Sequence, residues 1–177
     1  MRHDQRKLHI PLLACLLALA SCGAAPPVLE PVDAVDLQRF MGRWYVIANI
    51  PTFLEDDAFN AVETYRLDDD GTIATTFTFR DGGFDGAMKT YTPRGFVRDE
   101  SNAVWGMRFV WPVKADYRIV YLADDYSTTV IGRNKRDYVW IMAREPQIAE
   151  DEYRKLAAFV ADIGYDVARL QKVPQQW

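Results

Sequence analysis

Histidine and cysteine are scarce in this sequence of 177 residues, which contains two of each. His3, His9 and Cys15 all lie within the first 21 residues, so Cys22 is the one residue of either type after that point. The chain beyond residue 21 therefore cannot form an internal disulfide or a Cys/His metal site. It also lacks the histidine that Ser-His and Cys-His pairs and most haem sites require. We expect a protein without metal, cofactor or catalytic residues, and not an enzyme.

The sequence also has no long hydrophobic run. The apolar stretch at residues 10–20 is about half the length of a membrane-spanning helix, which needs about 20 residues. Arg2, Arg6 and Lys7 precede this stretch and small residues follow it, a pattern typical of an export signal peptide, here residues 1–21. Because this segment carries a net charge of +2, the total of −4 leaves −6 for the rest. A mildly acidic chain without a basic stripe is not expected to bind nucleic acid.

The residues at the end of the signal resemble the lipobox of bacterial lipoproteins. They read "LASC" at residues 19–22, and cleavage there would leave Cys22 as a lipid-modified N-terminus. The resemblance implies a lipoprotein that acyl groups such as palmitate hold on the periplasmic face of the outer membrane, since Gly23 rather than aspartate follows the cysteine. An ordinary signal peptide with an incidental cysteine is the alternative. We assign residues 22–34 to a lipidated N-terminus with a proline-rich tether and residues 35–177 to one globular domain.

Short runs of alternating apolar and polar residues dominate this domain. They are "WYVIANI", "FNAVETYRL", "TIATTFTF", "MKTYT", "RGFVRD", "VWGMRFVW", "YRIVYLA", "STTVIG" and "DYVWIMAR", separated by turn sequences such as "DDDG". Many short strands at near-regular spacing predict a β-sandwich or a β-barrel. After Pro146 the apolar residues recur at helical spacing up to Gly164, which predicts one amphipathic helix. Asp36 is a plausible N-cap of a short helical turn before the first strand.

The order of these elements, together with four sequence blocks, resembles the lipocalin family, and within it the bacterial outer-membrane lipoproteins of the Blc type. The blocks are "DLQRFMGRWYVIANIP", "VWGMRFVWPVKADY", "DDYSTTVIG" and "RDYVWIMAREP". The resemblance implies an all-β fold, an eight-stranded up-and-down antiparallel barrel with a C-terminal α-helix packed outside. It also implies that Gly42 and Trp44 form the Gly-x-Trp motif, with Trp44 closing one end of the barrel and Arg144 packing across the indole.

The two-residue period of a strand predicts which side chains face the interior of such a barrel. Trp44 and Arg144 fix which alternate residues of the first and last strands point inward, which we call the parity of the strand. Arg108, which must face water, fixes the parity of a middle strand. The resulting candidates for a ligand cavity are mostly apolar and aromatic: Val46, Ala48, Glu63, Tyr65, Thr75, Phe77, Phe79, Trp105, Met107, Phe109, Trp140 and Met142. The alternative is that these side chains fill the barrel without leaving a void.

Glu63 is the one carboxyl in this set. If it is buried without a partner its pKa should be raised, and it would then disfavour anionic head groups deep in the barrel. Alternatively, it lies at the rim in water or is neutralised by a cation such as Arg66.

Taken together, the sequence favours a membrane-anchored lipocalin, as a monomer or as a homodimer, that binds, stores or transports fatty acids or lysophospholipids for envelope maintenance. An envelope lipoprotein with a filled barrel that acts through protein contacts is the second hypothesis. A lipid-modifying enzyme is the third, although the lipocalin prostaglandin synthases use a cavity thiol that this chain lacks.

Overall fold

The computed structural model describes residues 27–109 and 112–177, so the predicted signal peptide and Cys22 lie outside the described residues. These residues form two α-helices, ten strands and one 3₁₀ helix, η1 (Val167–Arg169). No helix in the described part of the chain is long and apolar enough to cross a membrane. The elements are α1 (Leu37–Phe40), β1 (Gly42–Ile50), β2 (Ala58–Leu67), β3 (Thr72–Asp81), β4 (Ala87–Tyr91), β5 (Arg94–Val97), β6 (Val104–Arg108), β7 (Ala115–Leu122), β8 (Thr128–Gly132), β9 (Val139–Ala143), α2 (Glu150–Asp162) and β10 (Gln171–Lys172).

The strands form one antiparallel sheet that closes on itself. The strands pair in the order β1-β2-β3-β5-β6-β7-β8-β9, and β9 pairs back with β1. β5 pairs with the first half of β3, and β4 pairs with its second half. β4 and β5 therefore count as one strand of the barrel that is interrupted at Pro93. The result is the predicted eight-stranded barrel. Closure removes most of the free sheet edges that would otherwise invite aggregation.

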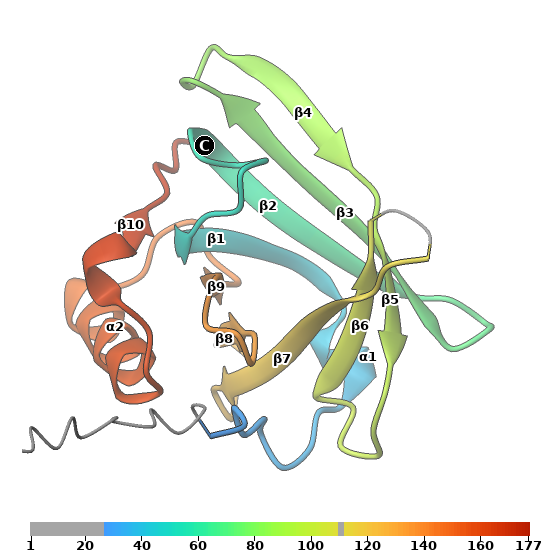
Figure 1. Ribbon diagram of the computed structural model, residues 1–177. Helices are drawn as coiled ribbons and strands as arrows, with labels where there is room; N and C mark the ends of the chain where they lie inside the picture. Colours follow the sequence, from blue (N-terminus) through green and yellow to red (C-terminus); the bar gives the residue numbers. More distant parts are fainter. Residues whose placement is uncertain (1–26, 110–111) are drawn as a thin grey trace, which may run out of the picture.

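The barrel is uneven at its open end. The hairpin of β3 and β4 projects beyond the other strands (Figure 1), and β4 is paired only with β3 among the described strands. Pro93 explains part of this break, because proline has no N–H to donate to a neighbouring strand.

Residues 171–176 complete the wall where β1 and β2 separate. β2 pairs with β1 only at residues 42–45, and beyond them β10 takes over this edge of β1, with Lys172 opposite Ala48. Gln175 Nε2 donates to the carbonyls of Val46 on β1, at 2.8 Å, and of Ala61 on β2, at 3.1 Å. Figure 1 shows this segment ending beside the start of β2. The segment therefore acts as a wedge between the two strands.

Helix α2 packs on the outside of the barrel, as predicted (Figure 1). Its apolar stripe buries Leu156 and Val160 in a second hydrophobic core against the outer faces of β1, β8 and β9. Three acidic residues in the first turn suit the positive end of the helix dipole. The helix ends at Asp162, and Gly164, just past the C-cap Ile163, has a φ of +93°, the left-handed conformation that favours glycine.

A β-bulge in β1 corrects one prediction about the interior. Val46 lies opposite Met142, but Ala48 lies opposite Ile141, so one extra residue stands in β1 between the two pairs. A bulge shifts the inward and outward alternation by one position. Ala48 therefore faces α2 in the outer core rather than the barrel interior, and its assignment to the cavity was wrong.

The described part of the predicted tether, residues 27–34, is not a free linker. The Leu29 side chain is buried, and its backbone N–H donates to Asn134 Oδ1 at 2.8 Å. Arg136 also donates to the carbonyl of Pro27, at 2.9 Å. These contacts hold the segment against the turn between β8 and β9. Proline-rich composition suggested a spacer, whereas these residues pack as part of the domain.

Candidate ligand-binding site

Trp44 and Arg144 close one end of the barrel. The guanidinium carbon of Arg144 lies 3.8 Å from the centre of the Trp44 ring, and the indole N–H donates to the Phe40 carbonyl at 2.9 Å. Arg144 also donates to the carbonyls of Arg39, Phe40 and Arg43, at 2.7, 3.0 and 2.8 Å. Partial burial lowers the pKa of Arg144 to about 10, so it remains charged at neutral pH. One side chain thus ties the end of the last strand to α1 and the start of β1.

The turn that leads into β1 explains the glycine of the motif. Gly42 has a φ of +95°, a conformation that other residues adopt only with strain. A Cβ at this position would also lie 3.4 Å from Arg144 Nη1. Just upstream, the Asp36 carboxylate accepts from the backbone N–H groups of Gln38 and Arg39 and caps α1, as predicted. The glycine lets the chain turn from α1 into the strand that carries Trp44.

Aromatic side chains fill the half of the barrel above this plug. Phe40 packs on Trp44 with ring centres 5.0 Å apart, and Trp105 meets Phe40 edge-on at 5.5 Å. Trp105 also stacks on Tyr117, with centres 5.0 Å apart and planes 7° from parallel, and Tyr65 packs edge-on against Trp105 at 5.6 Å. This part of the interior is a packed core, so the barrel is a shallow cup.

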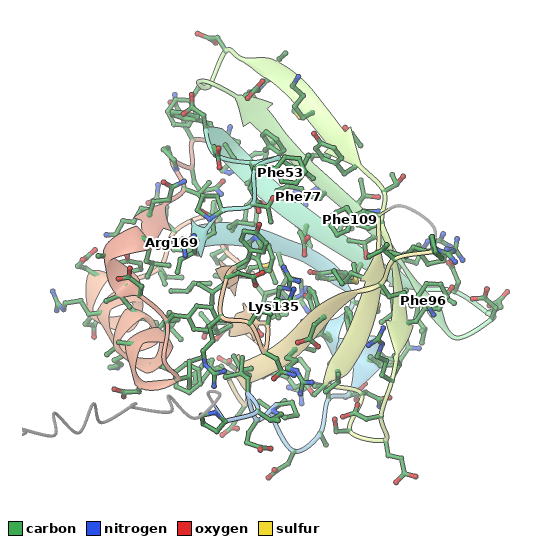
Figure 2. The ribbon with its side chains drawn as sticks, viewed as in Figure 1. Phe53, Phe77, Phe96, Phe109, Lys135 and Arg169 are labelled. Atoms are coloured by element: carbon green, nitrogen blue, oxygen red, sulfur yellow. The ribbon has the colours of Figure 1, made fainter. Side chains whose placement is uncertain are left out.

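A cavity of about 80 Å³ remains toward the open end. This space is several times the roughly 10–15 Å³ that one water molecule needs, so the side chains do not fill the barrel completely. Figure 2 marks Phe77 on β3 and Phe109 just after β6, two aromatic residues of the lining. The lining residues come from the loop between β1 and β2, from the strands and from the turn after β8: Thr52, Leu54, Glu55, Glu63, Phe77, Met107, Phe109, Ala115, Asp116, Tyr117, Ile131, Arg133 and Trp140.

The predicted candidates fall into three groups. Five line the cavity: Glu63, Phe77, Met107, Phe109 and Trp140, of which Phe109 lies at the mouth with about half of its surface exposed. Six others are buried without lining it. Val46, Tyr65, Phe79, Trp105 and Met142 belong to the interior core, and Thr75 is buried with a hydroxyl that has no hydrogen-bond partner among the described residues. Ala48 is outside the barrel, as described above.

Sequence reasoning missed the residues that approach the cavity from loops and from β7. Glu55 lies in the run "LEDD", which reads as an exposed acidic turn, yet it is 3% exposed. Tyr117 and Ala115 alternate along β7, and the parity argument applied to that strand would have found them. For Glu55 no local signal exists, because its burial depends on the loop that folds over the cavity.

Glu63 takes part in a hydrogen-bonded chain at the floor of the cavity. Its Oε2 accepts from the Tyr65 hydroxyl, and the hydroxyls of Tyr65 and Tyr117 lie 2.6 Å apart. Burial, and secondly the charge of Glu55, raise the pKa of Glu63 to about 8. Burial and then Glu63 likewise raise the pKa of Tyr117. Arg66 does not neutralise Glu63, because it is exposed and pairs with Asp68 at 2.9 Å.

Glu55 is the second buried carboxyl of the cavity. The indole N–H of Trp140 donates to both of its oxygens, at 3.2 and 3.3 Å, and the Thr52 backbone N–H donates to Oε1 at 3.1 Å. Burial raises its pKa, and the hydrogen bonds from Thr52 and Trp140 offset part of that rise. The charge of Glu55 in turn disfavours the ionisation of Glu63.

The other charged residues of the lining have partners. Arg133 lies 3.2 Å from Asp137, and its guanidinium lies over the Tyr138 ring. Asp116 pairs with Arg118 at 3.1 Å. No group of three or more His, Cys, Asp or Glu that could hold a metal ion occurs within residues 27–109 and 112–177.

Comparisons with known proteins agree with this architecture. Residues 35–175 match the model of the lipocalin-like domain. The chain is 32% identical to temperature-induced lipocalin-1 of Arabidopsis thaliana, over 83% of each chain, and 28% identical to the outer membrane lipoprotein Blc of Citrobacter freundii, over 92% of each. Its fold resembles that of Per a 4, a cockroach allergen, with a TM-score of 0.62 at 17% identity, covering 86% of this chain and 97% of the other. The chain therefore belongs to the lipocalin family.

Proposed function

We propose that this chain is a lipoprotein of the outer membrane that binds, stores or transports single-chain hydrophobic ligands, such as fatty acids or lysophospholipids, for envelope maintenance. The observation that carries the proposal is the apolar cavity at the open end of a barrel whose other end is plugged. A cup of this kind suits an acyl chain, because apolar walls replace water around the chain while its head stays near the mouth.

The lining supports an apolar ligand more than a polar one. Leu54, Phe77, Met107, Phe109 and Trp140 contribute aliphatic, aromatic and thioether surface. Burial of one methylene contributes about 0.8 kcal/mol, so even a few carbons inside the cup give measurable affinity. Methionine adapts its shape readily, which suits chains of different length. The proposed role is binding rather than catalysis.

A titration tests ligand binding directly. A soluble form that begins at residue 23, which keeps every described residue, is delipidated and titrated with a fatty acid, a lysophospholipid and a neutral detergent while tryptophan fluorescence is recorded. We expect saturable one-site quenching by the two lipids. Trp140→Phe should weaken the response, because Trp140 lines the cavity. Trp177→Phe is the matched control, since Trp177 is 66% exposed and is not part of the lining.

Absence of saturable binding by either lipid would contradict the proposal and would favour an envelope lipoprotein that acts through protein contacts. The anchor is tested separately by metabolic labelling of the full chain with an alkyne analogue of palmitate. Labelling that follows the outer-membrane fraction and disappears in Cys22→Ala would support the lipoprotein assignment. Label retained in Cys22→Ala would refute it.

A further inference from the structure

Glu55 and Glu63 form an acidic pair that the apolar-ligand proposal leaves unexplained. They come from different elements, the loop after β1 and strand β2, and both open into the same small cavity. Neither forms an ion pair with any described residue. An uncompensated buried carboxyl is costly to ionise, so a site that served only acyl chains would be more stable without this pair.

The neighbours of the pair give it no cation. Glu63 faces Tyr65 on its own strand, Tyr117 and Asp116 on β7, Glu55 in the loop and Arg133 at the turn after β8. Arg133, the one basic residue of the described lining, is paired with Asp137 and stacked on Tyr138, while Asp116 is paired with Arg118. The acidic groups of the lining that have no basic partner are thus the two glutamates.

The hydrogen bonds of the pair leave an acceptor free. Glu55 accepts from Trp140 and Thr52, whereas Glu63 accepts only through Oε2 among the described residues. Glu63 Oε1 is therefore available to a donor in the cavity. The Glu63 side chain is partly exposed, and the cavity that it lines gives a ligand access to it.

The chemistry of the free acceptor selects among possible head groups. A carboxylate head at this depth would place a negative charge beside two carboxyls that no cation compensates. An ammonium supplies three donors and a positive charge, and it would favour the ionised form of both glutamates. The hydrogen bond between a charged donor and a carboxylate is also stronger than one between neutral groups.

We propose that the cavity selects single-chain aliphatic amines, bound with the ammonium group against Glu55 and Glu63, over carboxylates of the same length, and that binding releases a proton from Glu63 to solvent. This inference rests on the proposed binding of single-chain amphiphiles and names a preferred class among them. The proton leaves the Glu63 carboxyl as the carboxylate pairs with the incoming ammonium, so one proton is released for each amine bound to the protonated protein.

Three ligands of one length test the preference. The full chain, reconstituted into phosphatidylcholine vesicles, is titrated at pH 7 with octylamine, octanol and octanoate by calorimetry, with protein-free vesicles as the blank. A hydrogen bond to a charged group contributes about 1.5–3 kcal/mol, which corresponds to about ten- to a hundredfold in affinity. We expect octylamine to bind tighter than octanoate by about this factor. Repeating the titration in buffers of different ionisation enthalpy counts the released protons.

Three variants separate the acidic pair from the rest of the cavity. Glu63→Gln should lower octylamine affinity about tenfold or more and abolish proton release, while octanol affinity changes little. Glu55→Gln should lower octylamine affinity as well. Asp57→Asn is the matched control, because Asp57 is an exposed acid of the same loop and is not part of the lining.

Octanoate affinity equal to or above that of octylamine, or an octylamine affinity that survives Glu63→Gln, would overturn this inference and leave the proposed function standing. If none of the three ligands bound, the proposed function would fail with it. Retained octanol binding in the variants shows that the cavity has kept its shape.

Discussion

Removal of the Arg144 guanidinium should destabilise the barrel by about 3 kcal/mol. The side chain makes three hydrogen bonds of 2.7–3.0 Å to backbone carbonyls at the closed end, and it stacks on Trp44. Hydrogen bonds to charged groups contribute about 1.5–3 kcal/mol when buried. Because these bonds are partly exposed, we take about 0.8 kcal/mol for each and about 0.5–1 kcal/mol for the cation–π contact.

Arg144→Met keeps the length and most of the apolar surface of the side chain. We expect its free energy of unfolding, measured by urea titration with fluorescence and circular dichroism, to fall by about 3 kcal/mol with an unchanged slope. Arg144→Lys keeps the charge but not the planar fork, so its loss should be intermediate. Arg66→Met is the control, because Arg66 is 75% exposed and its ion pair contributes less than about 1 kcal/mol. A loss for Arg144→Met no larger than that of the control would refute the reasoning.

Three further predictions concern Glu63 of the acidic pair, Leu156 of α2 and Gly132 of β8. The pKa of Glu63 is raised from 4.5 to about 8, so between these pH values the native state holds a proton that the unfolded chain has lost. The free energy of unfolding should therefore fall as the pH rises from 4.5 to about 8. Urea titrations across that pH range should show a smaller fall in the free energy of unfolding for Glu63→Gln than for the native protein. An equal fall in both would contradict the raised pKa of Glu63. Leu156→Ala should lower the free energy of unfolding, measured by heat or urea, by about 2–4 kcal/mol, because this side chain on the inner face of α2 is 2% exposed. A loss below about 1 kcal/mol would mean that the helix contributes little to stability. Gly132→Ala should cost about 1–3 kcal/mol, because its Cβ would lie 2.8 Å from Leu29 and 2.9 Å from the Tyr165 hydroxyl. Hydrogen exchange should show the segment around Leu29 losing protection, and unchanged protection would argue against tight docking.

The sequence predicted the parts of the fold that depend on local pattern. The strands, the outer helix, the Asp36 cap and the meeting of Trp44 with Arg144 follow from periodicity, capping chemistry and the family resemblance. The resemblance itself extends over most of the chain, which is why the barrel could be predicted rather than a sandwich.

What the sequence did not reveal depends on longer-range geometry. The bulge in β1 turns Ala48 outward, and no residue of that strand marks the extra position. Parity identifies inward side chains but not how much volume they fill, so Tyr65 and Trp105 were assigned to the cavity although they pack beneath it. Glu55 is buried only because its loop folds over the opening.

The wedge formed by residues 171–176 has a consequence for the order of folding. Gln175 bonds to Val46 and Ala61, and the first of these pairs is separated by 129 residues along the chain. The β1–β9 pairing is also distant, with Tyr45 opposite Ala143. Contacts of such separation slow folding, because a long loop must close before they form.

The barrel wall therefore cannot be completed while the chain is still emerging, and a nascent chain that ends before the wedge leaves the edges of β1 and β2 unpaired at the open end. The segment that fills this gap is the last described strand to emerge, so this part of the wall can close only after the rest of the described barrel has been synthesised.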